Sequence, residues 1–231
     1  MIKRTVAFIF ILSILSACSG LDIPDRFLLT SKRVAPELKT NNVVLGDPLF
    51  IRIFKEEHIL EVWMKARDRN DYTLIKTYPI CNWSGALGPK FYEGDLQAPE
   101  GFYSTNHANL NPNSQYFLSF NLQYPNAYDR NLNRTGSFLM VHGDCVSEGC
   151  YAMTDSQIEE IYFLVERSLD AGQIDVPVHI FPFKMTTERM VAEIGSPHFS
   201  FWMNIREGYN FFENHAVPPR WDVVNNRYDF Y

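Results

Sequence analysis

Between residues 49 and 142 the chain consists mainly of short apolar segments with the two-residue alternation that is typical of β-strands. Residues 49–55 and 59–65 both alternate, and Glu56-Glu57-His58 between them is short enough to form a hairpin loop. The other predicted strands are residues 74–81, which Pro79 marks as an edge strand or a bulge, 102–103, 116–122 and 137–142. We therefore expect this part of the chain to be rich in β-structure.

The main helices are predicted in the second half. Thr154-Asp155-Ser156-Gln157 has the form of a capping box, and apolar residues follow at helical spacing to about Leu169, before Gly172. After a strand over residues 176–183, two helices are predicted over 187–193 and 197–214, the second capped by Ser196, and a terminal hairpin turns at Asn225-Asn226. The expected fold class is α+β, with a domain over residues 48–185 and a C-terminal extension of helices and a hairpin over 186–231.

The first residues have the pattern of an export signal. Residues 1–4 carry two positive charges, residues 5–15 are apolar, and the small residues Ser16 and Ala17 follow. The apolar run is too short for a permanent membrane anchor, so residues 1–17 are interpreted as a signal peptide. Leu15-Ser16-Ala17-Cys18 resembles the lipobox of bacterial lipoproteins, which implies lipidation of Cys18. The alternative is ordinary cleavage after Ala17 with Cys18 incidental.

By the same resemblance, Ser19 implies sorting to the outer membrane, and we expect a periplasmic protein attached to the membrane only through its lipid anchor. Residues 18–47 are mostly polar and are predicted to be a tether, with room for a short helix. Removing 17 of 231 residues leaves 214, and the loss of Lys3 and Arg4 changes the net charge from -6 to -8. That length fits one domain with an extension.

Composition excludes several classes of function. An acidic chain with no basic run has little to attract nucleic acid. The sequence contains no GxGxxG motif, no phosphate-binding loop and no HExxH, so neither a cofactor nor a catalytic metal is expected. Apolar residues make up 46% of the chain, which is ample for a packed core.

Apart from Cys18, three cysteines remain after the export signal: Cys81, Cys145 and Cys150. In an oxidising compartment an odd number leaves at least one thiol unpaired or paired outside the chain. An unpaired thiol that survives export requires an explanation.

The segment "HGDCVSEGCYAMT", residues 142–154, can supply one. The apolar residues 137–141 are predicted to run through the core and to deliver His142 to a strand end, where Gly143 turns the chain. Gly149 permits a close backbone approach that brings Cys150 back beside His142. The imidazole could then take the thiol proton, while backbone N–H groups at Gly149 and Cys150 bind an oxyanion.

Other interpretations fit the same spacing. His142 could be a buried structural residue, with Cys145 and Cys150 as core residues or as a disulfide with a five-residue reach. A zinc site is a poorer fit, because one histidine and two cysteines at this spacing match no common ligand pattern and further ligands would have to come from Cys81 or His179.

The motif itself resembles a known one. His142-Gly143 followed by Ser147-x-Gly149-Cys150 is similar to the catalytic motif of the YkuD-fold L,D-transpeptidases, cysteine enzymes that act on the diaminopimelate-containing stems of peptidoglycan. Ala98-Pro99-Glu100-Gly101-Phe102-Tyr103 matches a second family motif. A narrower resemblance, to the YafK branch, covers roughly Pro48 to the C-terminus and includes Cys81-x-x-Ser84-Gly85-x-x-Gly88-Pro89-Lys90, Glu93-Gly94-Asp95, the segment 124–130 and the whole of 142–154.

This resemblance implies a YkuD-like sandwich or barrel as the catalytic domain, with Cys150 as nucleophile and His142 as its base. Gly149 would complete the catalytic motif, and Gly143 and Ser147 would form the turn or the oxyanion site. Cys145 becomes the spare cysteine, either in a disulfide with Cys81 or as a packed thiol. Carboxylates of the stem call for positive partners, and the resemblance places three candidates in nearby loops: Lys90, Arg130 and Arg134.

Two features depart from the family pattern. The gap between His142 and Cys150 is short, and Tyr151-Ala152-Met153 stands where the family usually has a basic residue. The stem carboxylates are therefore expected to bind in a different mode.

Three functions follow from these observations. The first is an amidase that cuts the link between a lipoprotein and peptidoglycan, because one member of the YafK branch is a diaminopimelate protein amidase that releases the major outer-membrane lipoprotein. The second is a transferase that makes such links or cross-links stems. The third is a non-catalytic lipoprotein that only holds stems, against which the intact motif argues. The expected partners are stem peptides and the attached outer-membrane lipoprotein.

Overall fold

The computed structural model describes residues 24–231. The predicted signal peptide and Cys18 lie outside the described residues. Within the described part, no helix is long and apolar enough to cross a membrane.

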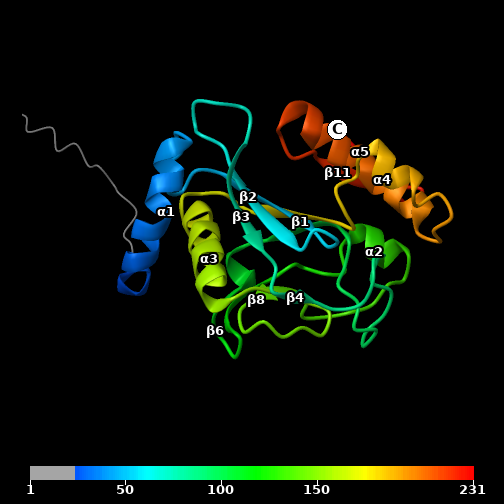
Figure 1. The fold of residues 1–231 in the computed structure, drawn as a ribbon, viewed down its shortest axis with the longest axis horizontal. Coiled ribbons are helices and arrows are strands. Elements are labelled where there is room, and N and C mark those ends of the chain that lie inside the picture. Colours follow the sequence, from blue (N-terminus) through cyan, green and yellow to red (C-terminus); the bar gives the residue numbers. More distant parts are fainter. Residues whose placement is uncertain (1–23) are drawn as a thin grey trace, which may run out of the picture.

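Two five-stranded sheets form the centre of an α+β fold (Figure 1). In the first sheet β1 and β10 are parallel and the other neighbours are antiparallel. Its strands, in spatial order, are β3 (Thr73–Pro79), β2 (Ile59–Met64), β1 (Leu49–Phe54), β10 (Val176–Phe181) and β5 (Gly101–Thr105). The strands predicted at 49–55, 59–65, 74–81, 102–103 and 176–183 are all in this sheet.

The second sheet combines β8 and β9 in parallel with three antiparallel neighbours. Its order is β4 (Asn82–Trp83), β9 (Tyr151–Ala152), β8 (Met140–His142), β7 (Phe117–Asn121) and β6 (Leu110–Ser114). β8 is shorter than the strand predicted over 137–142, because Phe138 has a φ of +53° and a side chain that is 73% exposed. The chain therefore enters the core only at Leu139.

Helix α3 (Asp155–Asp170) begins at the predicted capping box, where the Thr154 N–H donates to Gln157 Oε1 at 3.0 Å. Its apolar side chains join residues of both sheets in the main core. Short helices lie between strands: η2 (His107–Asn109) and α2 (Ala127–Asn131). A capping box formed by Asn126 and Asp129 starts α2.

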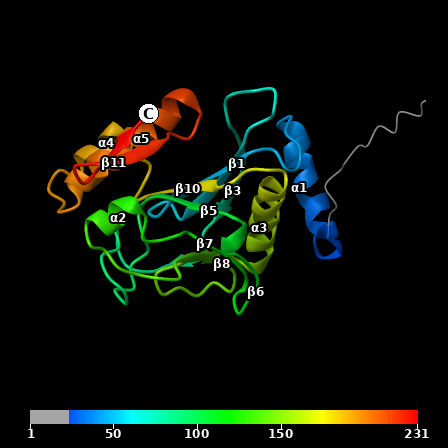
Figure 2. The same ribbon diagram turned by 180° about the vertical axis from the view of Figure 1, so that it is seen from behind.

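The segment predicted as a tether contains a 13-residue helix, α1 (Leu28–Thr40), preceded by η1 (Asp25–Phe27). Figures 1 and 2 show α1 on the outer side of α3. Phe27, Val34 and Leu38 are buried, and Arg33 pairs with carboxylates of α3. This stretch is therefore part of the folded domain from residue 25 onward.

The C-terminal elements cover the other face of the first sheet (Figure 2). They are α4 (Thr187–Val191), α5 (Phe199–His215) and the hairpin β11 (Trp221–Val224) with β12 (Arg227–Phe230). The β1 side chains on this face of the sheet pack under the C-terminal layer. Every residue of β1 is consequently buried. α5 starts after His198 and not at the predicted cap Ser196.

A buried ion pair connects this C-terminal layer to the loop over residues 86–98. Lys55 and Glu100 have fully buried side chains, and Lys55 Nζ lies 3.0 Å from Glu100 Oε1. Lys55 Nζ also donates to the carbonyl oxygens of Ala86, Gly88 and Ala98. The second Glu100 oxygen accepts the indole N–H of Trp202 in α5 at 2.8 Å. The Lys55 ammonium and both oxygens of the Glu100 carboxylate therefore have hydrogen-bond partners, as a buried ion pair requires.

Candidate active site

Parallel pairing of β8 with β9 sets the relation of His142 to Cys150. His142 ends β8 and lies opposite Ala152 of β9, and Cys150 is two residues before Ala152. Side chains two residues apart on a strand face the same side, so His142 and Cys150 share a face of the sheet. Both side chains line the same two cavities, of about 390 and 340 Å³.

His142 is held in one tautomer by its neighbour. Its buried ring packs on Tyr116 with a centroid distance of 4.7 Å, and Nδ1 lies 2.7 Å from the Gly143 carbonyl oxygen. A carbonyl can only accept, so Nδ1 carries the hydrogen and Nε2 keeps its lone pair. A Cβ at Gly143 would lie 2.6 Å from Asp155 Oδ1 and 2.9 Å from the Tyr116 carbonyl oxygen, and because the second contact is with backbone, glycine is required there.

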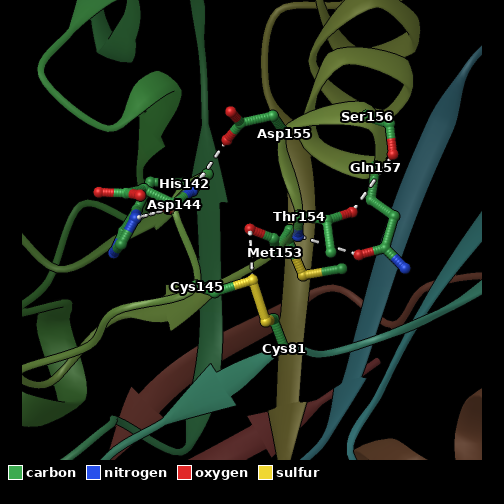
Figure 3. The surroundings of a disulfide bond; sticks show 10 residues. Cys81, His142, Asp144, Cys145, Met153, Thr154, Asp155, Ser156 and Gln157 are labelled. Atoms are coloured by element: carbon green, nitrogen blue, oxygen red, sulfur yellow. Dashed lines mark hydrogen bonds between the residues drawn. A yellow bond between two sulfur atoms is a disulfide. The ribbon is translucent and has the colours of Figure 1, made fainter.

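The cysteine pairing distinguishes between the interpretations of residues 142–150 as a catalytic pair, as structural residues with a disulfide, or as a zinc site. Cys81 and Cys145 form a disulfide, and Cys150 is the free cysteine of the described residues (Figure 3). The disulfide between Cys145 and Cys150 is thereby excluded. Within residues 24–231 no group of three histidine, cysteine or carboxylate side chains could hold a metal ion, so the zinc interpretation has no ligand set there.

Burial acts in opposite directions on the two reactive groups. It lowers the pKa of His142 from its ordinary value near 6.5, against smaller upward effects from the Gly143 hydrogen bond and the Asp144 charge. Burial also raises the pKa of the Cys150 thiol, against smaller downward effects of a hydrogen bond with the Met140 backbone and the Lys90 charge. Both shifts favour the uncharged forms, a neutral thiol and a neutral imidazole.

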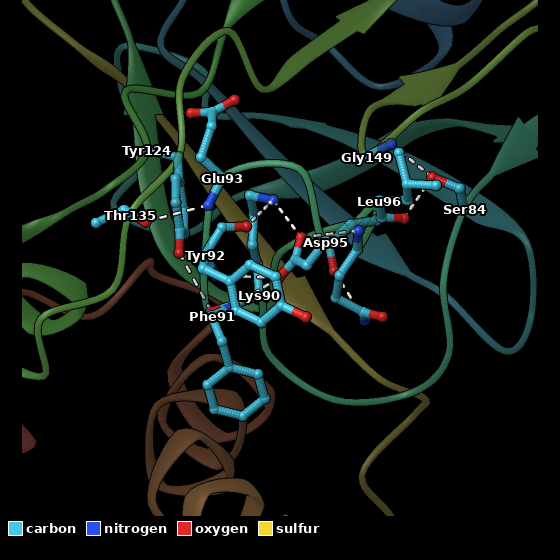
Figure 4. A network of polar contacts seen from close by, with 12 residues as sticks. Ser84, Lys90, Phe91, Tyr92, Glu93, Asp95, Leu96, Tyr124, Thr135 and Gly149 are labelled. Atoms are coloured by element: carbon cyan, nitrogen blue, oxygen red, sulfur yellow. Dashed lines mark hydrogen bonds and ion pairs between the residues drawn. The ribbon is translucent and has the colours of Figure 1, made fainter.

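The turn before Cys150 is fixed by two serines. Ser147 Oγ donates to the Cys150 carbonyl at 2.8 Å, and Gly149 has a φ of +103°. The Gly149 N–H donates to Ser84 Oγ at 2.5 Å (Figure 4), and Ser84 Oγ in turn donates to the Leu96 carbonyl at 2.8 Å. Of the two backbone donors predicted to bind an oxyanion, at Gly149 and Cys150, the Gly149 N–H is therefore occupied by Ser84 in this structure. Gly149 and Ser147 position the cysteine.

Ser84 is the positioning residue that the candidate residues taken from the sequence do not include. It lies 65 positions from Gly149, and its one sequence signal is its place in the Cys81-x-x-Ser84-Gly85 stretch.

Comparisons with known proteins show which family the chain resembles. Residues 50–180 match the family model of the L,D-transpeptidase catalytic domain, YkuD. The chain is 45% identical over 185 residues to the Escherichia coli K12 protein named "Putative L,D-transpeptidase YafK", covering 80% of this chain and 74% of that protein. A protein of the same name from Escherichia coli O157:H7 matches with the same identity and coverage.

This chain belongs to the YkuD family of L,D-transpeptidase catalytic domains. Two solved structures are also similar to it. The helical cell shape determining protein Pgp2 of Campylobacter jejuni has a TM-score of 0.46 at 19% identity, over 76% of this chain and 63% of that one. Bd1075 of Bdellovibrio bacteriovorus has a TM-score of 0.41 at 20% identity, over 72% and 58%. The chain thus spans less than two thirds of either solved protein.

The three cations predicted to bind substrate are placed differently in this YkuD domain. Lys90 is buried, forms an ion pair with Asp95 and donates to the Tyr92 carbonyl at 3.0 Å (Figure 4). Arg134 is also buried and lies 2.9 Å from Asp129, and Arg130 donates to the Pro125 carbonyl. None of the three lines either cavity at Cys150. The structure does not bring them to the thiol as substrate ligands.

The YkuD site instead has two cavities of different chemistry. The larger one carries two carboxylates, Glu93 and Glu148, next to Ser137, Val146 and Ser147. The smaller one is lined by uncharged residues, Asn111, Ser114, Gln115 and Met140. Tyr116, Phe138, His142 and Cys150 line both.

Proposed function

We propose that this protein is a cysteine-dependent peptidoglycan enzyme that acts at the L-centre carbonyl of meso-diaminopimelate, as an amidase that releases a covalently bound lipoprotein. The observation that carries the proposal is the free Cys150 thiol in the same cavities as His142, whose Nδ1 is held by the Gly143 carbonyl. The resemblance of residues 142–154 to the YafK branch supports the substrate class.

The geometry supports a two-step acyl transfer. His142 Nε2 takes the proton from Cys150 as the sulfur attacks the amide carbonyl, and a tetrahedral oxyanion forms. The protonated imidazole, which the Gly143 carbonyl stabilises, gives its proton to the departing amine as the C–N bond breaks. A thioester remains. Water then attacks it with His142 as base, which releases the carboxylic acid and restores the thiol.

The acidic cavity fits the amine side of such a substrate. At neutral pH, an amine that has been released from an amide becomes a cation once it leaves. An amine that will attack a thioester is likewise a cation before it arrives. Glu93 and Glu148 line the larger cavity, and no lysine or arginine does so in the described chain. Carboxylates there favour an ammonium over an anion.

Incubation of lipoprotein-bearing sacculi with the protein and with its Cys150→Ala variant tests this proposal. Freed lipoprotein from the wild type alone supports hydrolysis. Identical products from the two proteins would reduce the function to binding.

L,D-transpeptidation is the second candidate, because the family match and the name of the 45% identical relative support it. The two reactions share the thioester and differ in whether an amine or water captures it. New cross-linked muropeptides in the same assay would favour the transferase.

The place of action belongs to the same proposal. We infer a periplasmic enzyme with a lipid anchor at Cys18, which the sequence of residues 1–18 supports. Recovery of a Cys18→Ser variant in the soluble periplasmic fraction, with the wild type in outer membranes, is the expected result.

A further inference from the structure

Phe138 has a conformation that costs stability. Its φ of +53° lies in the left-handed region, which is costly for an L-residue with a bulky side chain. The residue is 73% exposed and so contributes little to the core, whereas its neighbour Leu139 is 4% exposed. Strain of this kind persists where the surroundings impose it, and it concentrates at functional sites.

The strained residue lies at the reacting sulfur. The Phe138 carbonyl oxygen is 3.5 Å from Cys150 Sγ and accepts its hydrogen bond. Phe138 is also one of four residues that line both cavities, and it is the one of the four with a largely exposed side chain. The ring therefore stands where the two cavities meet.

An amide substrate must occupy both cavities. With its carbonyl at Cys150, the acyl part extends to one side of the sulfur and the amine part to the other. The cavity of about 390 Å³ contains Glu93 and Glu148 and suits a cationic amine, whereas the cavity of about 340 Å³ offers the amide and hydroxyl groups of Asn111, Ser114 and Gln115 to a peptide.

We propose that Phe138 is a specificity-determining residue, whose ring forms the wall between an amine subsite on the Glu93 side and an acyl subsite on the Asn111 side. The ring packs on the aliphatic chain of the bound stem, which crosses between the two cavities. The left-handed backbone aims the ring outward and the carbonyl at the sulfur. This assignment rests on the proposed function and adds which side of the thiol takes which half of the substrate.

Phe117 provides a matched control. It also has a positive φ, +69°, and an exposed ring, at 46%, but it lines neither cavity. Phe138→Gly and Phe117→Gly both remove a ring and relieve a left-handed backbone, so both variants are expected to melt no lower than the wild type. With a stem peptide amide, Phe138→Gly is expected to raise KM about tenfold. Phe117→Gly should leave KM unchanged, and Phe138→Tyr should restore most of the binding.

Alkylation of Cys150 tests the same wall without any substrate. The rates with iodoacetamide and with a bulky N-substituted maleimide are measured for the wild type and both glycine variants. Removing the wall is expected to accelerate the bulky reagent more than the small one in Phe138→Gly alone. Unchanged relative rates in that variant would overturn the proposal, and so would an unchanged KM in an active enzyme. Failure of all the proteins to cleave the amide, with altered alkylation in Phe138→Gly, would reject the proposed function but keep the wall.

Discussion

The Gly143 carbonyl oxygen lies 2.7 Å from His142 Nδ1, and this contact between adjacent residues decides which imidazole nitrogen can act as a base. No carboxylate is needed to orient the ring, because a backbone acceptor and the Tyr116 ring already hold it. The His142 imidazole therefore has an uncharged hydrogen-bond partner, the Gly143 carbonyl. A neutral histidine in a buried site and a neutral thiol are the expected consequence.

The pH dependence of the reaction follows from the two shifts. The folded pKa of His142 lies below 6.5, so the imidazole stays neutral at pH 6.5 and is protonated only on further acidification. Turnover should be retained at pH 6.5 and lost below it. The raised thiol pKa predicts that the rate of Cys150 alkylation by iodoacetamide reaches its plateau only above pH 9. A plateau at neutral pH would instead indicate a preformed thiolate and imidazolium pair.

Removal of the Ser84 hydroxyl tests how the nucleophile is positioned. Ser84→Ala deletes the acceptor for the Gly149 N–H and the donor to Leu96, so the turn before Cys150 should loosen. We expect a stability loss of about 1 kcal/mol and a roughly tenfold lower kcat/KM. Ser104→Ala, which removes the hydroxyl of a half-buried serine that accepts from Gln123 Nε2, is the control. Equal activities in the two variants would exclude a positioning role for Ser84.

What the sequence could predict was mostly local. The α3 capping box and the hairpin loop between β1 and β2 each depend on a few neighbouring residues, and both were predicted where they occur. The packing of α1 is not evident from its sequence, because Val34 and Leu38 are its only buried apolar residues and polar residues outnumber them.

The differences at the site have a non-local cause. The sequence predicts the Gly149 N–H as an oxyanion donor, because nothing near it in sequence reveals Ser84, 65 positions away. The sequence predicts Lys90 and Arg134 as substrate ligands, because only the fold shows that they are buried against Asp95 and Asp129. A cation in a polar loop does not reveal its partner.

The buried pair of Lys55 and Glu100 predicts a large effect on stability. Glu100→Gln leaves the ammonium of Lys55 without a counter-charge at full burial, where desolvation already lowers its pKa. The expected loss of unfolding free energy is about 3–5 kcal/mol in urea denaturation. Glu207→Gln removes a partner from the exposed pair with Arg227 and should change stability little. Similar losses in both variants would contradict this account of the pair.

Loss of the disulfide should destabilise the protein without removing the nucleophile. Cys81 and Cys145 are 64 residues apart, and opening a loop of that length costs roughly 4 kcal/mol in the chain-entropy account. The double variant Cys81→Ser with Cys145→Ser should therefore unfold at lower denaturant concentration. Below its unfolding transition it should still turn over, because the hydrogen bonds of Ser84, Ser147 and Gly143 that position Cys150 and His142 involve neither sulfur of the bridge.

The single variant Cys145→Ser provides the sharper measurement of the same point. It should keep turnover when circular dichroism shows a folded protein, and Cys150 should still react with iodoacetamide. A folded Cys145→Ser protein with no turnover and no alkylation at Cys150 would contradict the expectation that the Cys150 thiol functions independently of the Cys81–Cys145 bridge. Loss of turnover with an intact alkylation rate at Cys150 would place the fault in the geometry of the 143–150 loop, because the thiol itself would then be unimpaired.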